Sequence, residues 1–346
     1  MFLRVLELTD TPVLGPRSPG AEHTRFGFEG GTAHKIAGRY YVFTTEVFDE
    51  PKTGVSRLVL FDSDDGVSFS RHSVVAETDR DPADPVEGTT PWSPMSVFDP
   101  ATNRWSVFFV IYRQKPGSEQ PYNMSGVIGR VDSAVHGYDG IVGPYSETVL
   151  VDFDVDGDDW EGGAGIVSYF PFQVGDQWYA FFGANTAPTF IEPESLPQEQ
   201  NDQQILFHVG LARADSLVGR WTRVSELNPV LMDPEFIENP IVTRLRPDLY
   251  AVVYDGGNRH EISYALSTDG LRWGSEQLID LPHVPSWLDA VRTPLGLIPE
   301  DDGTFTLFFT AFDGVNPEAV LPLWHDGFGY VGRCTVALED SHGPRD

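Results

Sequence analysis

Short runs of alternating hydrophobic and polar residues recur along the chain, and this period of two predicts β-strands rather than helices. Five segments share one order: a polar start, a Pro or Gly, an alternating run, a polar turn and an aromatic-rich run. The five segments begin at Glu29, Trp92, Tyr169, Glu238 and Arg292. Two alternating runs joined by a short polar turn are typical of a β-hairpin, so each segment predicts two antiparallel strands.

Third strands with similar sequences follow most of these hairpins. Residues 57–69 and 262–273 both pass from an alternating run through an Asp-Gly turn to an aromatic residue. Residues 209–221 and 126–133 are weaker variants of the same pattern. The turn and the residue that follows it predict a return of the chain into a fourth, outer strand.

Repeated four-stranded antiparallel sheets arranged radially form a β-propeller, which protects most strand edges. Five such repeats nearly fill the sequence, and no stretch has a sustained helical period or a linker-like composition. We therefore predict an all-β protein, a five-bladed β-propeller that forms one catalytic domain over residues 1–346. The acidic segment 188–204 is expected to be a loop, either a lid over one face or a solvated segment.

The composition narrows the range of partners. The chain has 52 acidic and 23 basic residues, a net charge of −29, which repels phosphate backbones and anionic lipids. We therefore expect no nucleic-acid and no membrane partner, and no run approaches the roughly 20 apolar residues of a spanning helix. The N-terminal residues lack the pattern of a secretory signal, so we expect a cytoplasmic protein. The sequence leaves the oligomeric state open.

Cysteine, glycine and proline usage agrees with this fold class. The single cysteine, Cys334, excludes an internal disulfide and any multi-cysteine metal site. The 34 Gly and 27 Pro residues suit many short strands separated by turns.

The repeat itself predicts a site. In a propeller the innermost strand of each blade lines a central channel, so residues at one repeat position meet around the axis. That position holds Glu29, Trp92, Tyr169, Glu238 and Arg292. Two carboxylates that face each other repel, so one binds its proton more tightly, as general acid–base catalysis requires. The two aromatic residues suit stacking on a sugar ring, and Arg292 can hold hydroxyls or a carboxylate in a fixed fork.

Other residues compete for these roles. Asp255, Asp289 and Glu161 are alternatives to Glu29 as the base, and Asp255 also belongs to a polar rim predicted where the second strands end. The other rim candidates are Glu46, Arg113, Asn185 and Asp313. The same residues also have a structural interpretation. A glutamate then pairs with Arg292 only to fix the register of the blades, and the aromatic residues only pack in the channel. His34 and His325 are interpreted as structural histidines rather than metal ligands.

The chain resembles a known superfamily at short motifs. Trp92-Ser93-Pro94, Glu238-Asn239-Pro240 and the stretch 212–221 resemble the five-bladed glycosidase superfamily, which includes glycoside hydrolase families 43, 32, 62, 68, 117 and 130. The resemblance implies that Glu238 is the general acid. It also implies that Trp92 and Asn239 lie in the sugar site. It allows a structural cation in the channel near His325, while no cofactor and no metal ligand is expected from the residues themselves.

Two departures from the family pattern point to a divergent, family 43-like or family 117-like member. Gly30 stands where the family has its aspartate base, and Phe170 stands where an aspartate orients the acid. Glu29, one position earlier than Gly30, is the candidate that replaces the base.

The predicted function is that of a glycoside hydrolase, exo-acting and inverting, on a short oligosaccharide or small glycoside. Glu238 is expected to act as general acid and Glu29 as general base. Tyr169, Trp92, Arg292, Asn239, Asp255 and Asp289 are the candidate substrate-binding residues. The alternative is a sugar-binding propeller without hydrolytic activity, or a propeller that catalyses another glycosyl-transfer reaction.

Overall fold

The computed structural model describes residues 1–48, 55–77, 79–81, 84–113, 126–154, 156–186, 207–230, 237–256, 261–314 and 327–340. In this part of the chain the structure is made of β-strands and one short 3-10 helix, η1 (Tyr138–Val142). The prediction of an all-β protein is thus confirmed. No helix among the described residues has the length and apolar character needed to cross a membrane.

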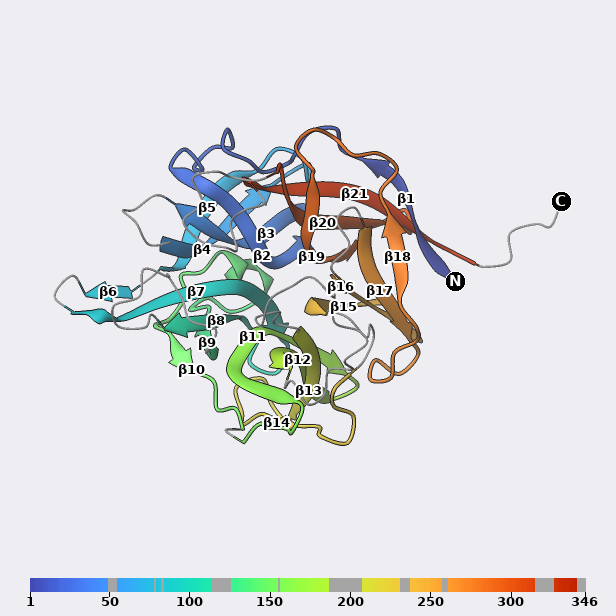
Figure 1. The fold of residues 1–346 in the computed structure, drawn as a ribbon. Helices are drawn as coiled ribbons and strands as arrows, with labels where there is room; N and C mark the ends of the chain where they lie inside the picture. Colours follow the sequence, from blue (N-terminus) through green and yellow to red (C-terminus); the bar gives the residue numbers. More distant parts are fainter. Residues whose placement is uncertain are drawn as a thin grey trace, which may run out of the picture.

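The described strands form three hydrogen-bonded sheets of eight, nine and four strands (Figure 1). The two larger sheets are each divided by one parallel bridge, so we describe the strands as five antiparallel units. Unit 1 comprises β2 (Thr24–Ile36), β3 (Arg39–Phe48), β4 (Val55–Ser63) and β5 (Ser70–Glu77). Unit 2 comprises β7 (Asp84–Asp99), β8 (Arg104–Arg113), β9 (Gly126–Asp132) and β10 (Val149–Leu150), and β7 also pairs with β6 (Asp79–Asp81). Unit 3 comprises β11 (Glu161–Val174), β12 (Gln177–Thr186), β13 (Phe207–Ala214) and β14 (Thr222–Arg223). Unit 4 comprises β15 (Glu238–Arg246), β16 (Leu249–Asp255), β17 (Glu261–Ser267) and β18 (Gln277–Asp280).

Unit 5 joins the two ends of the described chain. It comprises β19 (Ala290–Pro299), β20 (Phe305–Phe312), β21 (Gly329–Glu339) and the N-terminal strand β1 (Phe2–Leu8), which pairs antiparallel with β21. Figure 1 shows β1 beside β21. Residues from the beginning and the end of the sequence therefore complete one sheet, which ties the first unit to the last.

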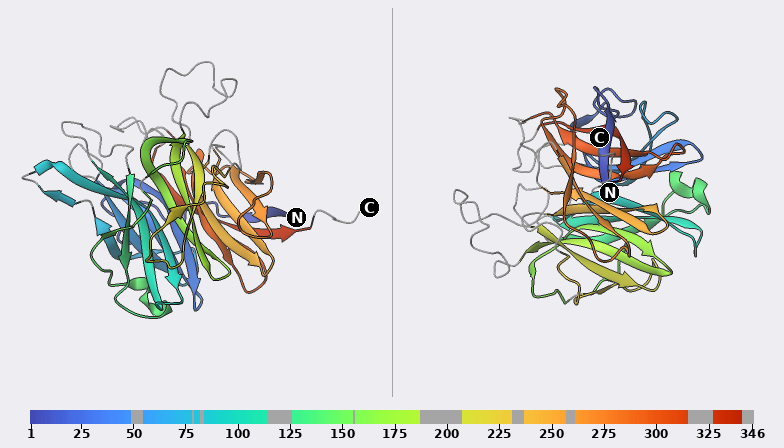
Figure 2. Two further views of the ribbon diagram at one scale, coloured as in Figure 1. Left: turned by 90° about the horizontal axis from the view of Figure 1, so that it is seen from below. Right: turned by 90° about the vertical axis from the view of Figure 1, so that its right-hand side faces the viewer.

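The first strands of the five units are neighbours in a ring. Contacts run from β2 to β7, β11, β15 and β19 and back to β2. Single parallel bridges, Gly27 with Gly329 and Gly165 with Gly126, connect units 5 and 1 and units 2 and 3. Seen from the side, the strands run from one face of the molecule toward the other (Figure 2). No sheet closes on itself by hydrogen bonds among the described residues, so five blades remain a prediction.

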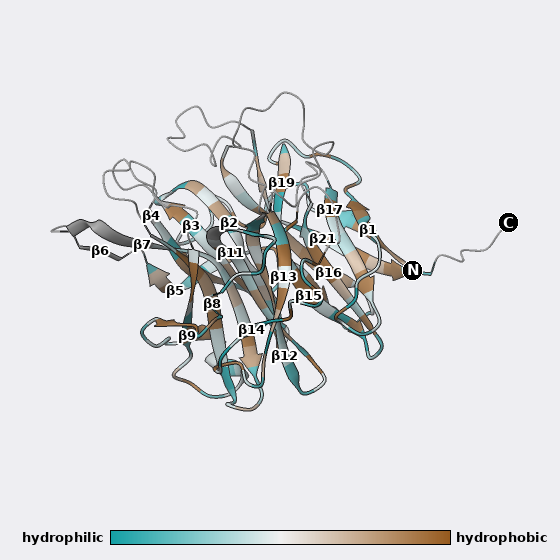
Figure 3. Ribbon diagram, turned by 60° about the horizontal axis from the view of Figure 1, so that its bottom comes forward, coloured by the Kyte–Doolittle hydropathy of each residue, from teal (hydrophilic) through white to brown (hydrophobic). Residues whose placement is uncertain are grey.

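The core lies between neighbouring units. Every residue of β16 and of β20, the second strands of units 4 and 5, is buried. A strand with both faces covered is apolar along its whole length rather than alternating. Figure 3 shows the hydrophobic stretches on β16.

Irregularities in the first strands prepare the site. The register of β2 shifts between Glu29 and Gly31, that of β15 between Glu238 and Ile241, and that of β7 between Trp92 and Met95. The residues that follow Glu29, Trp92 and Glu238 have left-handed backbones, with φ of 63° at Gly30, 51° at Ser93 and 53° at Asn239. A bulge re-aims the side chains around it, so three repeats turn one residue in the same way.

The third repeat departs from this arrangement. In β11 the register shifts between Ile166 and Ser168, whereas Tyr169 pairs regularly with Phe182. Equating Tyr169 with Glu29 and Glu238 therefore places the third repeat out of phase, because the bulge of β11 precedes Tyr169, whereas the bulges of β2 and β15 follow Glu29 and Glu238. Tyr169 is not the structural equivalent of Glu29 and Glu238.

Candidate active site

Three carboxylates from units 1 and 4 meet one guanidinium from unit 5. Arg292 Nε donates a hydrogen bond to Glu29 Oε1 at 2.9 Å, across 263 positions of sequence. Arg292 Nη1 lies 2.7 Å from Glu238 Oε2 and also donates to Asp255 Oδ2. The side chains are 7% (Glu29), 10% (Glu238), 8% (Asp255) and 25% (Arg292) exposed. We call these four residues the Arg292 cluster.

The strands explain how these side chains converge. Glu238 pairs directly with Asp255 across β15 and β16, so both side chains leave the sheet on the same face. Glu29 precedes the bulge of β2, and Arg292 is the extra residue between the paired positions Val291 and Thr293 of β19. Because Glu29 and Glu238 bind two nitrogens of one planar guanidinium, their bound oxygens lie within about 8 Å of each other.

Burial and like charge dominate the electrostatics of the cluster. Burial raises the pKa of Glu29 to about 7, and the Glu238 and Asp255 carboxylates add to this shift while Arg292 opposes it. Burial by itself lowers the pKa of Arg292, but the Glu238, Glu29 and Asp255 carboxylates more than offset this and hold it well above the usual range. The guanidinium thus stays charged, and Glu29 exchanges a proton near neutral pH.

Two atoms in the site have unused hydrogen-bonding capacity within the described part of the chain. Glu238 Oε2 is buried and makes its ion pair with Arg292 without hydrogen-bond geometry. The Oδ1 atom of Asn239 is buried and has no hydrogen-bond partner among the described residues. Buried polar atoms of this kind cost free energy unless water or a ligand bonds to them.

Aromatic side chains from unit 2 border the cluster. Trp92 is 8% exposed and packs in a small apolar cluster with Val47, Val110 and Tyr112. Tyr112 donates a hydrogen bond to the carbonyl oxygen of Val167 at 3.3 Å. Its pKa is raised by burial and then by the Glu238 and Glu29 carboxylates, so its phenol lies within the electrostatic reach of both acids.

Tyr112 was missed in the sequence. The sequence feature that could have indicated Tyr112 is its position at the end of β8, next to the rim candidate Arg113. A tyrosine after an apolar run is typical of a strand core, and only the tertiary structure brings this one within the electrostatic reach of the acids. The side chain of Arg113 lies outside the described residues.

Several predicted residues do not join the cluster. The ring of Tyr169 is 1% exposed and packs against Phe108, Phe153 and Trp221, so the prediction of a sugar platform at this residue is wrong. Its place in the hydrophobic core follows from the shifted bulge of β11. Asp289 is exposed and precedes β19, where its backbone N–H donates to the carbonyl of Phe312 at 2.7 Å.

Glu161 has a structural partner. Arg223 Nε and Nη2 donate to its two carboxylate oxygens at 2.6 and 2.8 Å, and both side chains are at most 10% exposed. This bidentate pair links β11 to β14 and occupies both oxygens of Glu161. The structure thus gives Glu161 a role in unit 3.

Two residues of the predicted rim, Glu46 and Asp313, also have structural partners. Glu46 is completely buried and accepts hydrogen bonds from Thr24, Arg57 and Arg71, which makes it the centre of an ion-pair network within unit 1. Asp313 accepts hydrogen bonds from Phe328 N at 2.8 Å and Tyr330 Oη at 3.0 Å.

Asn185 ends unit 3, where it pairs with Phe207. Its side chain is half-buried, and no contact among the described residues connects it to the Arg292 cluster.

His34 has a partner that fits a structural role. His34 bonds through Nε2 to the hydroxyl and carbonyl of Ser96, as its structural interpretation predicts. His325 and the segment 188–204 lie outside the described residues. Within the described part of the chain, no group of three or more His, Cys, Asp or Glu side chains has the arrangement to hold a metal ion.

Comparison with known proteins gives matches in structure only. No protein-family model matches the chain, and no curated protein is similar to it in sequence. A complex of BT0996 with RGII has a TM-score of 0.65 at 14% identity, over 98% of this protein and 94% of that one. The fold is that of the propeller glycoside hydrolases.

Two further structures support this statement. A family 117 glycoside hydrolase from the marine bacterium Zobellia galactanivorans has a TM-score of 0.61 at 12% identity, over 98% of this protein and 93% of that one. A GH43 enzyme from Xanthomonas citri has a TM-score of 0.57 at 15% identity, over 96% and 92%. At such identities the similarity is one of fold, so the roles of Glu29 and Glu238 have to be argued from their own geometry.

Proposed function

We propose that the chain is a glycoside hydrolase whose five units are the blades of one propeller domain over residues 1–346. The observation that carries the proposal is the convergence of Glu29 and Glu238 on Arg292. The two acids come from different units and are both nearly buried. Glycoside hydrolysis needs two carboxyl groups on opposite sides of the scissile bond, and the fold is that of enzymes with this activity.

In the proposed mechanism Glu238 protonates the leaving oxygen of the glycosidic bond. Its Oε2 atom forms an ion pair with Arg292, so the proton for the leaving group is delivered when this contact is given up or from the other carboxyl oxygen. Glu29 deprotonates a water that attacks the anomeric carbon from the other side. A carboxyl with a pKa of about 7 is well matched to accepting a proton near neutral pH.

Stereochemistry depends on the spacing of these acids. Inverting glycosidases leave about 6.5–9.5 Å between the two carboxyl groups for the water, whereas retaining enzymes have them about 5–5.5 Å apart. The upper limit of about 8 Å set by the shared guanidinium leaves room for a water between the acids but also admits the shorter spacing. We propose inversion, with Arg292 and Asp255 fixing the position of Glu238, and the configuration of the first product decides between the two outcomes.

The substrate is proposed to be a short oligosaccharide or small glycoside, held at its end. Trp92 and Tyr112 provide an aromatic wall, and Asn239 Oδ1 provides a buried acceptor for a sugar hydroxyl. Three carboxylates around one guanidinium disfavour an anionic sugar at this position. Asp289 is proposed as an outer contact because it is exposed at the entry to β19.

A panel of aryl glycosides followed by kinetics on the active sugar tests the proposal. Glu238→Gln is expected to lower kcat by about a hundredfold or more with an unchanged fold, because proton delivery to the leaving group is lost. Glu161→Gln is the matched control, since Glu161 is equally buried but bound to Arg223. NMR of the first product identifies inversion or retention. Full activity of Glu238→Gln, or no hydrolysis of any glycoside, contradicts the proposal.

One observation favours the alternative, a sugar-binding propeller or another glycosyl-transfer enzyme. All three carboxylates are paired with Arg292 in the structure without a ligand, an arrangement that also suits fixed recognition of sugar hydroxyls. Saturable binding of a sugar without release of any product supports binding alone. Transfer to an added acceptor sugar supports the other reaction.

A further inference from the structure

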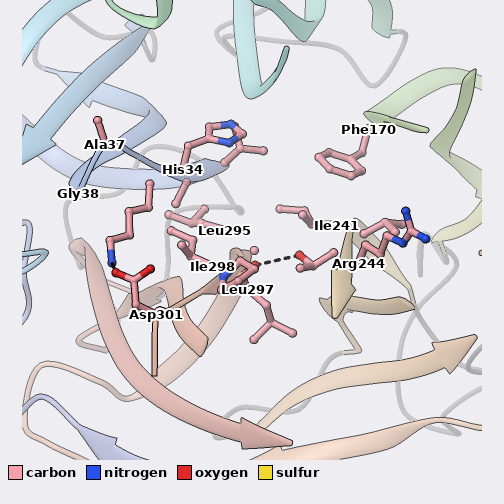
Figure 4. Close-up of a pocket in the computed structure, with 17 residues that line it drawn as sticks. His34, Ala37, Gly38, Phe170, Ile241, Arg244, Leu295, Leu297, Ile298 and Asp301 are labelled. Carbon is pink, nitrogen blue, oxygen red and sulfur yellow. Dashed lines mark hydrogen bonds and ion pairs between the residues drawn. The ribbon is translucent and has the colours of Figure 1, made fainter. Parts of the chain in front are cut away.

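A cavity of about 700 Å³ opens away from the Arg292 cluster, along the same first strands. Its walls come from β2, β11, β15 and β19 (Figure 4). Thr32, Ile241 and Leu295 line it, each three positions after Glu29, Glu238 and Arg292 respectively. None of the four residues of the Arg292 cluster lines the cavity, so it is distinct from the proposed active site. Its volume falls within the range of about 300–1,000 Å³ of ligand pockets.

Small residues keep this cavity open. Ala33, Ala37, Gly38 and Gly296 lie along its walls, where larger side chains would fill the space. Gly296 has φ of 109°, and a Cβ atom there would approach Ile241 Cγ2 to 3.3 Å. A Cβ atom at Gly38 would meet nothing within 4 Å. The hollow is thus built into the strands and their turns.

Apolar side chains and one aromatic ring lie at the centre of the cavity, although the lining as a whole is more polar than apolar. Leu295 and Ile241 are at most 3% exposed, and Phe170 is 8% exposed. Figure 4 shows Phe170 and His34 on one side of the cavity, above Leu295 and Ile241. Burial lowers the pKa of His34 to about 4, so the imidazole is neutral at neutral pH. This centre suits an apolar ring face rather than a charged group.

The rim has polar groups on two opposite sides. On one side Lys35 Nζ lies 2.5 Å from Glu300 and 3.9 Å from the exposed carboxylate of Asp301. On the other side Arg244 is exposed, and its guanidinium donates to the carbonyl of Pro247. Arg244 also lies over the ring of Tyr250 at 5.7 Å. The cations Lys35 and Arg244 are matched in number by the anions Glu300 and Asp301, so this part of the rim has no excess charge of either sign. An anionic ligand gains little here, and a lipid tail would desolvate charges of both signs.

We propose that this cavity binds a neutral sugar unit, with one apolar ring face against Phe170 and hydroxyl groups bonded to Arg244 and Asp301. The ligand class follows from the balanced rim charges and the apolar aromatic centre. The protein would then carry two carbohydrate sites, one at the Arg292 cluster and one in this cavity. The second site does not depend on hydrolysis at the first.

Hydrogen-exchange mass spectrometry of the full chain with galactose, xylose and arabinose tests this proposal, with galacturonic acid as the charged counterpart. At least one neutral sugar is expected to slow exchange in residues 32–38 and 295–301, and galacturonic acid is expected to do so less. Arg244→Gln and Asp301→Ala are expected to weaken the protecting sugar about tenfold in a titration, because each removes a charge-assisted hydrogen bond.

Arg246→Gln is the matched control, because Arg246 is exposed on the same strand but does not line the cavity. It is expected to leave both the titration and hydrolysis unchanged, and Arg244→Gln is expected to leave hydrolysis unchanged. No protection by any of the neutral sugars overturns the proposal. Equal affinity in wild type, Arg244→Gln and Asp301→Ala does so as well. Either result leaves the assignment of Glu238 and Glu29 untouched, since that assignment is tested by product formation.

Discussion

Replacement of Glu29 by Gln should stabilise the protein at alkaline pH, although it removes a buried partner of Arg292. The ordinary pKa of a glutamate is 4.5, and in the folded protein that of Glu29 is about 7, chiefly through burial. The folded state therefore favours the protonated form of this carboxyl. Its contribution to stability is fully present below pH 4.5 and is lost as the pH rises through about 7.

The size of the loss follows from the separation of the two pKa values. One pH unit corresponds to about 1.4 kcal/mol, so ionising Glu29 in the folded state costs about 3 kcal/mol. Gln has nearly the same shape and does not ionise. The free energy of unfolding of Glu29→Gln, relative to wild type, should therefore rise by about 3 kcal/mol between about pH 4.5 and about pH 8.

Urea unfolding at several pH values, with the m-value checked for constancy, measures this difference. Glu161→Gln serves as a control, because it breaks the bidentate pair with Arg223 and should destabilise the protein at both ends of the range. A relative stability of Glu29→Gln that stays level or falls with rising pH refutes the reasoning. Such a result means that the attraction to Arg292 outweighs the desolvation of Glu29.

Four further predictions concern the same structure. Wild-type kcat/KM should have a rising limb centred near pH 7, since Glu29 acts as a base only when ionised, and should fall again once the general acid Glu238 has lost its proton; a profile without the rising limb contradicts the role of Glu29. Arg292→Met should lower the free energy of unfolding by more than about 3 kcal/mol at about pH 8. At about pH 5 the loss should be smaller, because the carboxyl groups left without their cation take up protons. Equal losses at both pH values argue against a charge effect. Tyr112→Phe should lower kcat/KM about tenfold with an unchanged circular dichroism spectrum, because a hydroxyl within the electrostatic reach of both acids is lost, and wild-type kinetics excludes a role for it. Gly27→Ala should cost more than about 2 kcal/mol in thermal unfolding, since its Cβ would lie 2.1 Å from the Gly329 carbonyl at φ of 90°, whereas Gly38→Ala, with a similar φ and open space, should cost less.

Much of the fold could be predicted because its strands and repeats depend on local sequence patterns. Alternation with a period of two distinguishes strands from helices without any knowledge of long-range contacts. Repetition of the pattern then placed Glu29, Glu238 and Arg292 at one position of three repeats, and these residues do meet in the structure. Their convergence could be predicted from the sequence because equivalent residues of repeated units lie around the same axis.

The third repeat shows where this reasoning stops. A proline is a usable marker only if it has the same distance from the bulge in every repeat, and in β11 it does not. The bulge depends on pairing with β12, so Tyr169 could be assigned to the core only from the tertiary structure. Glu161 looked like Glu29 because both precede two glycines, yet Arg223 from a distant strand engages it.

The amino-acid order by itself determined the strand content, the repeats and the acidic and basic residues available for chemistry, since these properties depend on neighbours within a few positions. The tertiary structure decided which carboxylates share a guanidinium, which are neutralised elsewhere, and how tightly Glu29 binds its proton. Those outcomes depend on burial and on charges hundreds of positions away, which no local pattern records.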